Sequence, residues 1–160
     1  MDKSHLLQLI IAQLNHDLSV QFNAALAAHE ASTHEENIPD NKYETLALEA
    51  SYVAQGQANR AQEIRRALEV YKQLTLQHFD DSSAIGLTAL VTLSDADDNA
   101  RTLFIGPLEG GMKIVLQQTE VVVITPASPL GRDLIGKSAG DSVKTGIGRE
   151  RNEFEIVEVC

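Results

Sequence analysis

The chain has 160 residues and a mass of 17.4 kDa, enough for one domain or two small ones. Hydrophobic residues make up 43% of it, which excludes a disordered chain, and no run of about eighteen apolar residues predicts a membrane span. Thirteen basic against twenty-three acidic side chains give a net charge of −10, which argues against a protein that grips nucleic acid by neutralising phosphates.

The sequence also indicates where the protein resides. The N-terminal stretch has no small-residue cleavage site, so we expect no signal peptide. A single cysteine, Cys160, cannot form an internal disulfide, which fits a reducing cytoplasm. We expect no structural zinc site, because the chain has one cysteine and its five histidines are scattered along the sequence.

Composition changes near residue 80. Residues 1–79 contain one glycine and one proline and are rich in Ala, Leu, Gln and Glu, whereas residues 80–160 hold nine glycines and three prolines. We therefore predict two domains, a helical part at 1–79 and a strand-rich part at 80–160.

Two helices are expected in the first part, the second at about residues 40–76. Apolar residues recur every three or four positions in both, at Leu7, Ile11, Leu14, Leu18, Phe22 and Ala25, and at Ala50, Ala54, Ala58, Ala61, Ile64, Leu68 and Tyr71. The stripes are narrow, which favours a projecting antiparallel helical hairpin, a coiled coil, over a small bundle. Alanines gather near the connection around Pro39, either to let the helices approach or because alanine favours helix.

Five strands are expected in the second part, at 87–93, 100–106, 113–125, 141–147 and 153–159. One short helix fits residues 128–137, with Ser128 as N-cap, Pro129 at its first position and Gly136 near its end. The predicted fold class is thus α+β, a helical hairpin followed by a mostly antiparallel β domain with one short helix.

No nucleophile, phosphate-loop or zinc-protease motif is present in the sequence. The spacing of His29, Glu30 and His34 is compatible with a metal site, although a solvated helix end is the preferred interpretation. Carboxylates are densest near the connection, at Glu30, Glu35, Glu36, Asp40 and Glu44. They either form a soluble loop that suits the dipole of the second helix, or hold a hard cation shared with another molecule. The shared cation is the favoured interpretation, because a thin hairpin can carry acidic side chains at its far end into a narrow channel.

Three segments of the second part resemble the C-terminal domain of the Gre-type bacterial transcription elongation factors. They are VTLSDADDNARTLFIG at 91–106, SPLGRDLIGKSAGDSV at 128–143 and EFEIVEV at 153–159. The hairpin with its acidic tip near 33–44 matches the family layout, so the resemblance covers essentially the whole chain.

The resemblance implies an FKBP-like domain at 80–160 and RNA polymerase as the partner. The hairpin would enter the secondary channel of the polymerase, and tip carboxylates would help to hold Mg²⁺ of the polymerase active site while the 3′ end of backtracked nascent RNA is cleaved. The chain would have no cofactor of its own and would be an accessory factor rather than an enzyme. Ser128, Pro129 and Leu130 would dock at the channel rim.

The resemblance assigns the tip residues in one of two registers. In one, Asp40 matches the Asp of the family, and Tyr43 stands at the Glu position with Glu44 one step further on. In the other, Asp40 and Asn41 match the Glu–Asn pair, and Glu36 takes the place of the Asp. We predict Asp40 first, then Glu44 and Glu36, as the catalytic carboxylates, with Asp40 and Glu44 reaching the metal.

Other readings stay open. A Gre-like regulator would occupy the channel without stimulating cleavage, and a plain hairpin protein would have another partner. Arg60, Arg65 and Arg66 either meet RNA or are ordinary exposed helix charges. A peptidyl-prolyl isomerase is disfavoured, because residues 80–160 offer only two aromatic side chains, Phe104 and Phe154, to form a proline pocket.

Overall fold

The computed structural model describes the backbone of residues 1–35, 41–146 and 151–160, and the side chains of 1–31, 51–146 and 151–160. It divides the chain into two compact units. The hairpin unit is Ile10–Lys72, and the sheet unit combines Met1–Leu9 with Gln73–Cys160. The first turns of the N-terminal helix therefore belong with the sheet.

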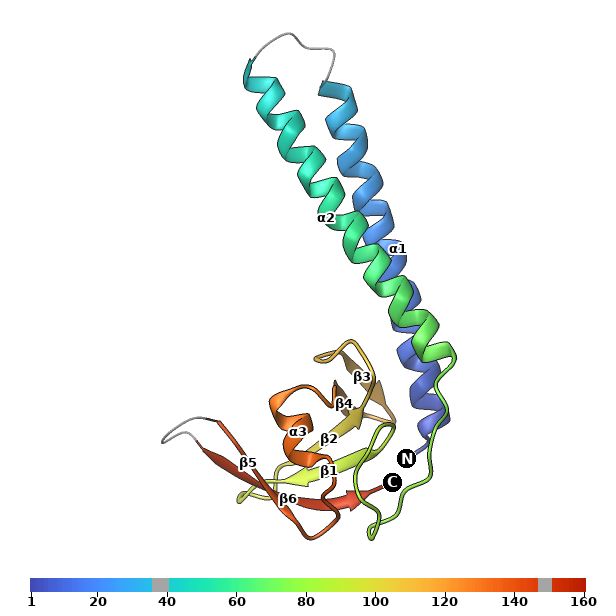
Figure 1. Ribbon diagram of the computed structural model, residues 1–160, viewed down its shortest axis with the longest axis vertical. Helices are drawn as coiled ribbons and strands as arrows, with labels where there is room; N and C mark the ends of the chain where they lie inside the picture. Colours follow the sequence, from blue (N-terminus) through green and yellow to red (C-terminus); the bar gives the residue numbers. More distant parts are fainter. Residues whose placement is uncertain (36–40, 147–150) are drawn as a thin grey trace. The chain divides into compact units, whose positions relative to one another are not determined.

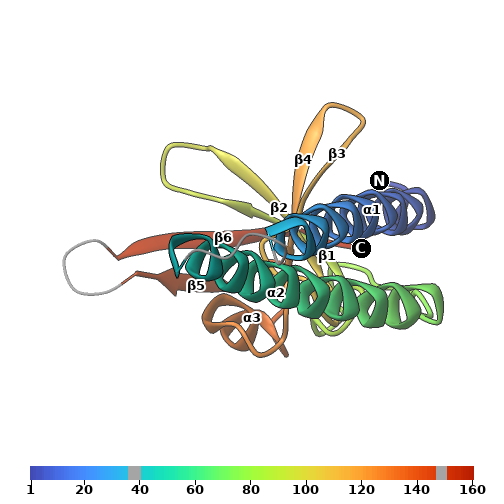
Figure 2. The same ribbon diagram turned by 90° about the horizontal axis from the view of Figure 1, so that it is seen from above.

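The hairpin unit consists of two long helices, as predicted. Helix α1 spans Lys3–Glu35 and α2 spans Asn41–Lys72, so the second helix ends four residues before the expected position 76. They lie side by side and run in opposite directions (Figures 1 and 2). The buried apolar side chains of the hairpin unit are Ile10, Leu14, Ala61, Ile64, Ala67, Leu68 and Tyr71.

Burial in the hairpin unit decreases toward the connection between the helices. The fully buried leucine and isoleucine side chains lie near the start of α1 and the end of α2. Beyond them the seam consists of half-buried alanines, including Ala25, Ala54 and Ala58. Larger residues there lie outside the seam, because Phe22 is 57% exposed and Leu26 is 49% exposed. Apolar burial thus stabilises one end of the hairpin more than the other.

The sheet unit contains one six-stranded sheet in the order β3-β4-β2-β1-β6-β5. The strands are β1 Leu90–Ser94, β2 Ala100–Ile105, β3 Lys113–Leu116, β4 Thr119–Ile124, β5 Ser142–Thr145 and β6 Asn152–Val159. Among the strands of the described residues, only β2 and β4 pair in parallel, so the predicted mostly antiparallel α+β fold is confirmed.

The single strand expected at 113–125 is wrong, because these residues form the hairpin of β3 and β4. Gln117 and Gln118 both have positive φ, 49° and 69°, which is the backbone of a type I′ turn. That turn usually carries Asn or Gly. Because glutamine is not a residue that usually marks this turn, the turn could not be predicted from the sequence.

The short helix α3, Pro129–Leu134, packs on one face of the sheet through buried Leu134. The core on that face also receives Phe79 and Ile85 from the segment that follows α2. Ala89, just before β1, is also a member, and the strands contribute the remaining ones, Val91, Leu93, Leu103, Ile105, Val143, Phe154, Ile156 and Val159.

Lys3 fastens the start of α1 within the sheet unit. Its Nζ donates hydrogen bonds to the carbonyl oxygens of Gln77 at 2.5 Å and Thr88 at 3.3 Å. The same ammonium lies 4.8 Å from the centroid of the Phe79 ring, a cation–π distance. Burial lowers the pKa of Lys3. Buried Thr88 has φ 71°, and its Oγ1 accepts a hydrogen bond from the Gln77 N–H at 2.9 Å.

Gly131 is required by a close backbone contact. A Cβ built at this position would lie 2.0 Å from the carbonyl oxygen of Thr125. We expect Gly131→Ala to destabilise the sheet unit by about 1–3 kcal/mol, because α3 must move away from the preceding turn. Thermal unfolding followed by circular dichroism measures the loss.

Gly86→Ala is the matched control in the same unit. Its Cβ would make ordinary contacts of 3.8 Å with the Phe79 ring. Equal melting temperatures for the two variants would show that the close approach at Gly131 is unimportant.

Candidate functional site

The segment Ser128–Leu130 occupies the turn into α3. The Ser128 Oγ accepts a hydrogen bond from the Gly131 N–H at 3.0 Å and donates one to the Thr125 carbonyl oxygen at 2.8 Å. Its backbone, φ −67° and ψ 155°, is extended, as an N-cap requires. The predicted cap is therefore confirmed, and the hydroxyl is engaged within the fold.

The three predicted docking residues differ in what they present to solvent. Pro129 is exposed at the first position of α3. Leu130 is partly buried and packs against the core. Ser128 is half-buried and holds the turn. Pro129 is thus the side chain of this segment that offers the most surface to a partner, while its two neighbours set its position.

Acidic side chains of the sheet unit hold turns together. Asp95, between β1 and β2, accepts hydrogen bonds from the backbone N–H of Asp97 and of Asn99, both at 2.9 Å, and from the Asn99 side chain. The bonds from Asn99 are the main cause that lowers the pKa of Asp95. Bonds from Ser82 and Ser83 likewise lower the pKa of Asp80. These carboxylates stay charged near neutral pH and serve the turns of this unit.

The predicted tip carboxylates lie outside the described residues. Glu36 and Asp40 belong to 36–40, and the side chain of Glu44, in the first turn of α2, is also outside them. Their assignment stays a prediction. His34 is outside the described side chains too, and the described residues hold no group of three His, Cys, Asp or Glu that fits a metal ion.

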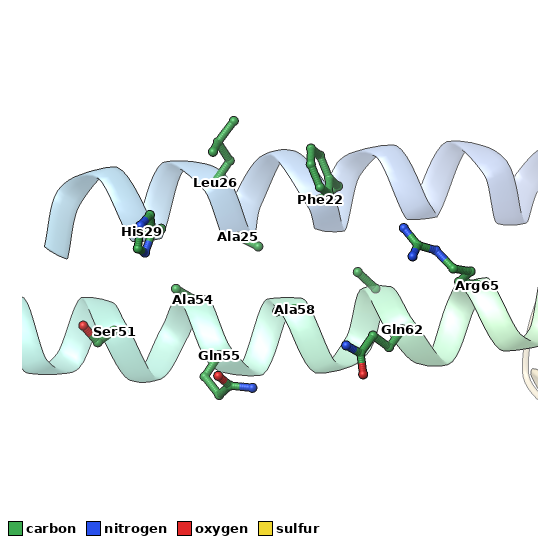
Figure 3. A pocket seen from close by; sticks show the side chains of 11 residues that line it. Phe22, Ala25, Leu26, His29, Ser51, Ala54, Gln55, Ala58, Gln62 and Arg65 are labelled. Atoms are coloured by element: carbon green, nitrogen blue, oxygen red, sulfur yellow. The ribbon is translucent and has the colours of Figure 1, made fainter. Parts of the chain in front are cut away.

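The hairpin carries a groove of about 460 Å³ along one face. Figure 3 shows its side chains, with Ala25 and Ala54 turned toward the opposite helix and His29 and Arg65 near its two ends. The remaining lining residues are Phe22, Leu26, Ser51, Gln55, Ala58, Ala61 and Gln62. The groove was not predicted from the sequence. Phe22 and Leu26, which lie one helical turn apart beside alanines, could have indicated it.

The three arginines of α2 have different surroundings. Arg60 forms an ion pair with Glu63 at 3.2 Å. Arg65 lines the groove, and Arg66 is exposed. Both interpretations of these arginines, contact with RNA and ordinary exposed helix charges, stay open.

Two further observations bear on the alternatives. Phe104 and Phe154, the two aromatic residues of 80–160, are buried in the sheet unit, so neither ring is exposed to receive a proline.

Among the described residues, no helix combines the length and apolar character needed to cross a bilayer.

Comparison with known proteins assigns the family. The family model for "Transcription elongation factor, GreA/GreB, C-term" matches residues 80–160, which include all six strands and α3. The chain belongs to the GreA/GreB family of transcription elongation factors.

Among curated relatives, the chain is 28% identical over 156 residues to transcription elongation factor GreA of Xanthomonas campestris pv. campestris. The match covers 96% of this chain and 92% of the relative. GreA of Xanthomonas axonopodis pv. citri gives the same identity and coverage.

Solved structures with some similarity include the transcription factor Gfh1, at 19% identity and a TM-score of 0.41, covering 93% of this chain and 92% of that one. The GreA factor homolog 1 protein of Thermus thermophilus has 18% identity and a TM-score of 0.38, covering 94% of both chains.

The Ser128 cap leads to a stability prediction. Ser128→Ala removes both hydrogen bonds of the hydroxyl, so we expect a loss of about 0.5–2 kcal/mol in the unfolding free energy of the sheet unit. Urea unfolding measures it. Ser128→Asp keeps an acceptor for the Gly131 N–H, so its loss should be smaller. An Asp variant as unstable as the Ala variant would contradict the capping role.

Proposed function

We propose that this chain inserts its helical hairpin into the secondary channel of RNA polymerase and stimulates the polymerase to cleave backtracked RNA. The observation that carries the proposal is the family match of residues 80–160 in a chain whose other unit is a two-helix hairpin with an acid-rich connection. The polymerase performs the hydrolysis, and this chain is an accessory factor that works where the polymerase is, in the cytoplasm.

The dimensions of the hairpin suit a narrow channel. At about 1.5 Å per residue, the 32 residues of α2 extend about 48 Å, while a pair of helices is only roughly 20 Å wide. The described residues of the hairpin unit form these two helices, so the alanine-rich part of this unit is two helices wide. A probe of this kind delivers the residues of its connection into a space that a globular domain is too wide to enter.

The chemistry of the tip suits a hard cation. Asp40 is the first candidate ligand, then Glu44 and Glu36, and carboxylate oxygens are the donors that Mg²⁺ prefers. The ion belongs to the polymerase active site, and this chain has no cofactor of its own. In two-metal hydrolysis, a second ion activates the attacking water. The carboxylates of this chain would hold that ion in place beside the 3′ end of the nascent RNA.

The segment Ser128–Leu130 is the proposed docking surface at the channel rim. Pro129 presents an apolar ring, and the hydrogen bonds of Ser128 hold the turn that carries it. Rigid apolar contacts lose little conformational entropy when they bind.

A second candidate is a regulator that occupies the channel without stimulating cleavage. The tip sequence favours it, because Tyr43 stands three residues after Asp40 where the family resemblance calls for Glu. The two candidates share the partner and differ only at the tip.

Cleavage by backtracked RNA polymerase in the presence of this chain tests the proposal. We expect Asp40→Asn to lower stimulated cleavage roughly tenfold or more, with smaller losses for Glu44→Gln and Glu36→Gln, because a missing ligand weakens the hold on the ion. Glu63→Gln, an exposed carboxylate elsewhere on α2, is the control and should leave cleavage unchanged.

Two results would change the conclusion. Binding without stimulated cleavage by the unaltered chain would establish the regulator instead. Full stimulation by all three tip variants would show that other residues supply the ligands.

Docking is tested separately through Pro129. Pro129→Glu places a charge on an exposed position of α3, so we expect binding to RNA polymerase to weaken several-fold while the melting temperature stays nearly unchanged. Affinity is measured with fluorescently labelled chain. Unchanged affinity in a folded variant would remove Pro129 from the docking surface.

A further inference from the structure

The hairpin unit contains two stretches that differ in packing. The base comprises residues 10–18 of α1 and 64–72 of α2. The groove segment comprises residues 22–29 of α1 and 51–62 of α2, and all residues that line the groove except Arg65 belong to it. Both helices pass through both stretches, so any difference in stability between them arises within continuous helices.

Apolar burial is concentrated in the base. Ile10, Leu14, Ile64 and Tyr71 are all 0 or 1% exposed there. In the groove segment, every side chain except that of Ala61 is exposed or half-buried, and a space of about 460 Å³ remains along it. Because fewer apolar contacts are buried in the groove segment, less free energy opposes separation of the two helices there than in the base.

Gly56 weakens α2 in the same stretch. It is the single glycine of this helix, and Gln55 and Ala58, on either side of it, line the groove (Figure 3). A Cβ at this position would meet no described atom within 4 Å, so packing does not require glycine here. Glycine inside a helix is less stable than alanine, because its unfolded backbone has more conformational freedom to lose.

Gln21 adds an unpaired polar atom on α1 where the groove begins. Its Oε1 is buried and accepts no hydrogen bond from the part of the chain that the structure describes. It directly precedes Phe22, the first residue of the groove lining. A buried acceptor without a partner opposes the packed state, whereas water can donate to it once the helices separate. Gln21 therefore favours the separated helices at this level of the hairpin.

We propose that the hairpin opens locally at the groove segment, so that its connection end separates and re-forms while the base stays packed. Three independent features act in this direction: the unfilled groove, Gly56 on α2 and Gln21 on α1. Proteins open in cooperative units whose stability follows their buried contacts. The boundary between two such units then lies between the groove segment and the base.

Local opening has a consequence for the polymerase that rests on the proposed function. After the hairpin has entered the channel, opening at the groove segment would let the acidic connection change its position. The carboxylates could then adjust to the metal ion without any loss of packing in the base. Motions of loops and lids of this kind often limit the rate of a catalysed reaction.

Hydrogen–deuterium exchange of the full chain, followed by mass spectrometry of peptides from both helices, measures the opening without polymerase. We expect amides of the groove segment to exchange roughly a hundredfold faster than those of the base. Gly56→Ala should slow exchange in the groove segment about threefold to fivefold, because it removes the glycine penalty. Gln21→Leu should slow it at least as much, because the unpaired oxygen is gone.

Asn15→Ala is the matched control. Asn15 is exposed on α1 in the base, and alanine raises the helix propensity there as well. A groove segment that opens by itself should exchange at the same rate in this variant as in the unaltered chain. Exchange of the groove segment slowed equally by Asn15→Ala and Gly56→Ala would show that the hairpin opens as one unit, which overturns the proposal. Equal exchange rates in the base and the groove segment would overturn it too.

The consequence for the polymerase is tested with the double variant Gly56→Ala and Gln21→Leu. At saturating concentration it should stimulate cleavage by backtracked RNA polymerase roughly threefold less than the unaltered chain, with unchanged affinity. Full stimulation by a double variant whose exchange is slowed would contradict a role of the opening in cleavage. A chain that opens at the groove segment and stimulates no cleavage would contradict the proposed function and support the local opening.

Discussion

A hairpin of two helices can bury only one seam, and the character of the hairpin unit depends on how its apolar residues are distributed along that seam. The largest buried side chains, among them Ile10, Leu14, Ile64 and Tyr71, lie at one end. There they remove enough apolar surface from water to hold long helices together, since isolated helices gain little from propensity alone. Toward the connection, alanines keep the pair thin and leave a groove. Large side chains therefore stabilise one end of the hairpin, and small side chains keep the other end thin.

In the sheet unit, close contacts of the backbone fix the position of α3, whereas in the hairpin unit the size of the side chains sets how the helices pack. The Thr125 carbonyl approaches Gly131 so closely that no side chain fits there, and the Ser128 hydroxyl bridges the same two residues. Together these contacts fix α3 and leave the Pro129 ring exposed. The hydrogen bonds of Ser128 therefore hold the turn from which the proposed docking residue, Pro129, is exposed.

The negative charge of the chain is divided between two tasks. In the sheet unit, Asp80 and Asp95 have pKa values lowered by hydrogen bonds and organise turns. Near the hairpin connection, the carboxylates at 35–44 crowd together in the sequence. Crowded carboxylates repel one another unless a cation lies among them, which is the physical basis of the proposed role at the polymerase metal.

The sequence predicted those features that local chemistry controls. Helical periodicity gave both helices, and Ser128 followed by Pro129 gave the start of α3, because caps and periods involve residues close together in the chain. The motifs at 91–106, 128–143 and 153–159 also indicated the family to which the chain belongs. The end of α2 and the turn at Gln117 and Gln118 were missed, since neither has the residues that usually mark such positions.

By itself, then, the sequence determined the fold class and indicated the family, because both depend on periodicity and short motifs. Only the tertiary structure decided that Ser128 is engaged internally while Pro129 is exposed, that Gly131 is a packing requirement, and that α1 and α2 leave a groove beside Phe22 and Leu26. These properties depend on which atoms of distant segments meet, and distances between such atoms are set by packing rather than by the order of residues along the chain.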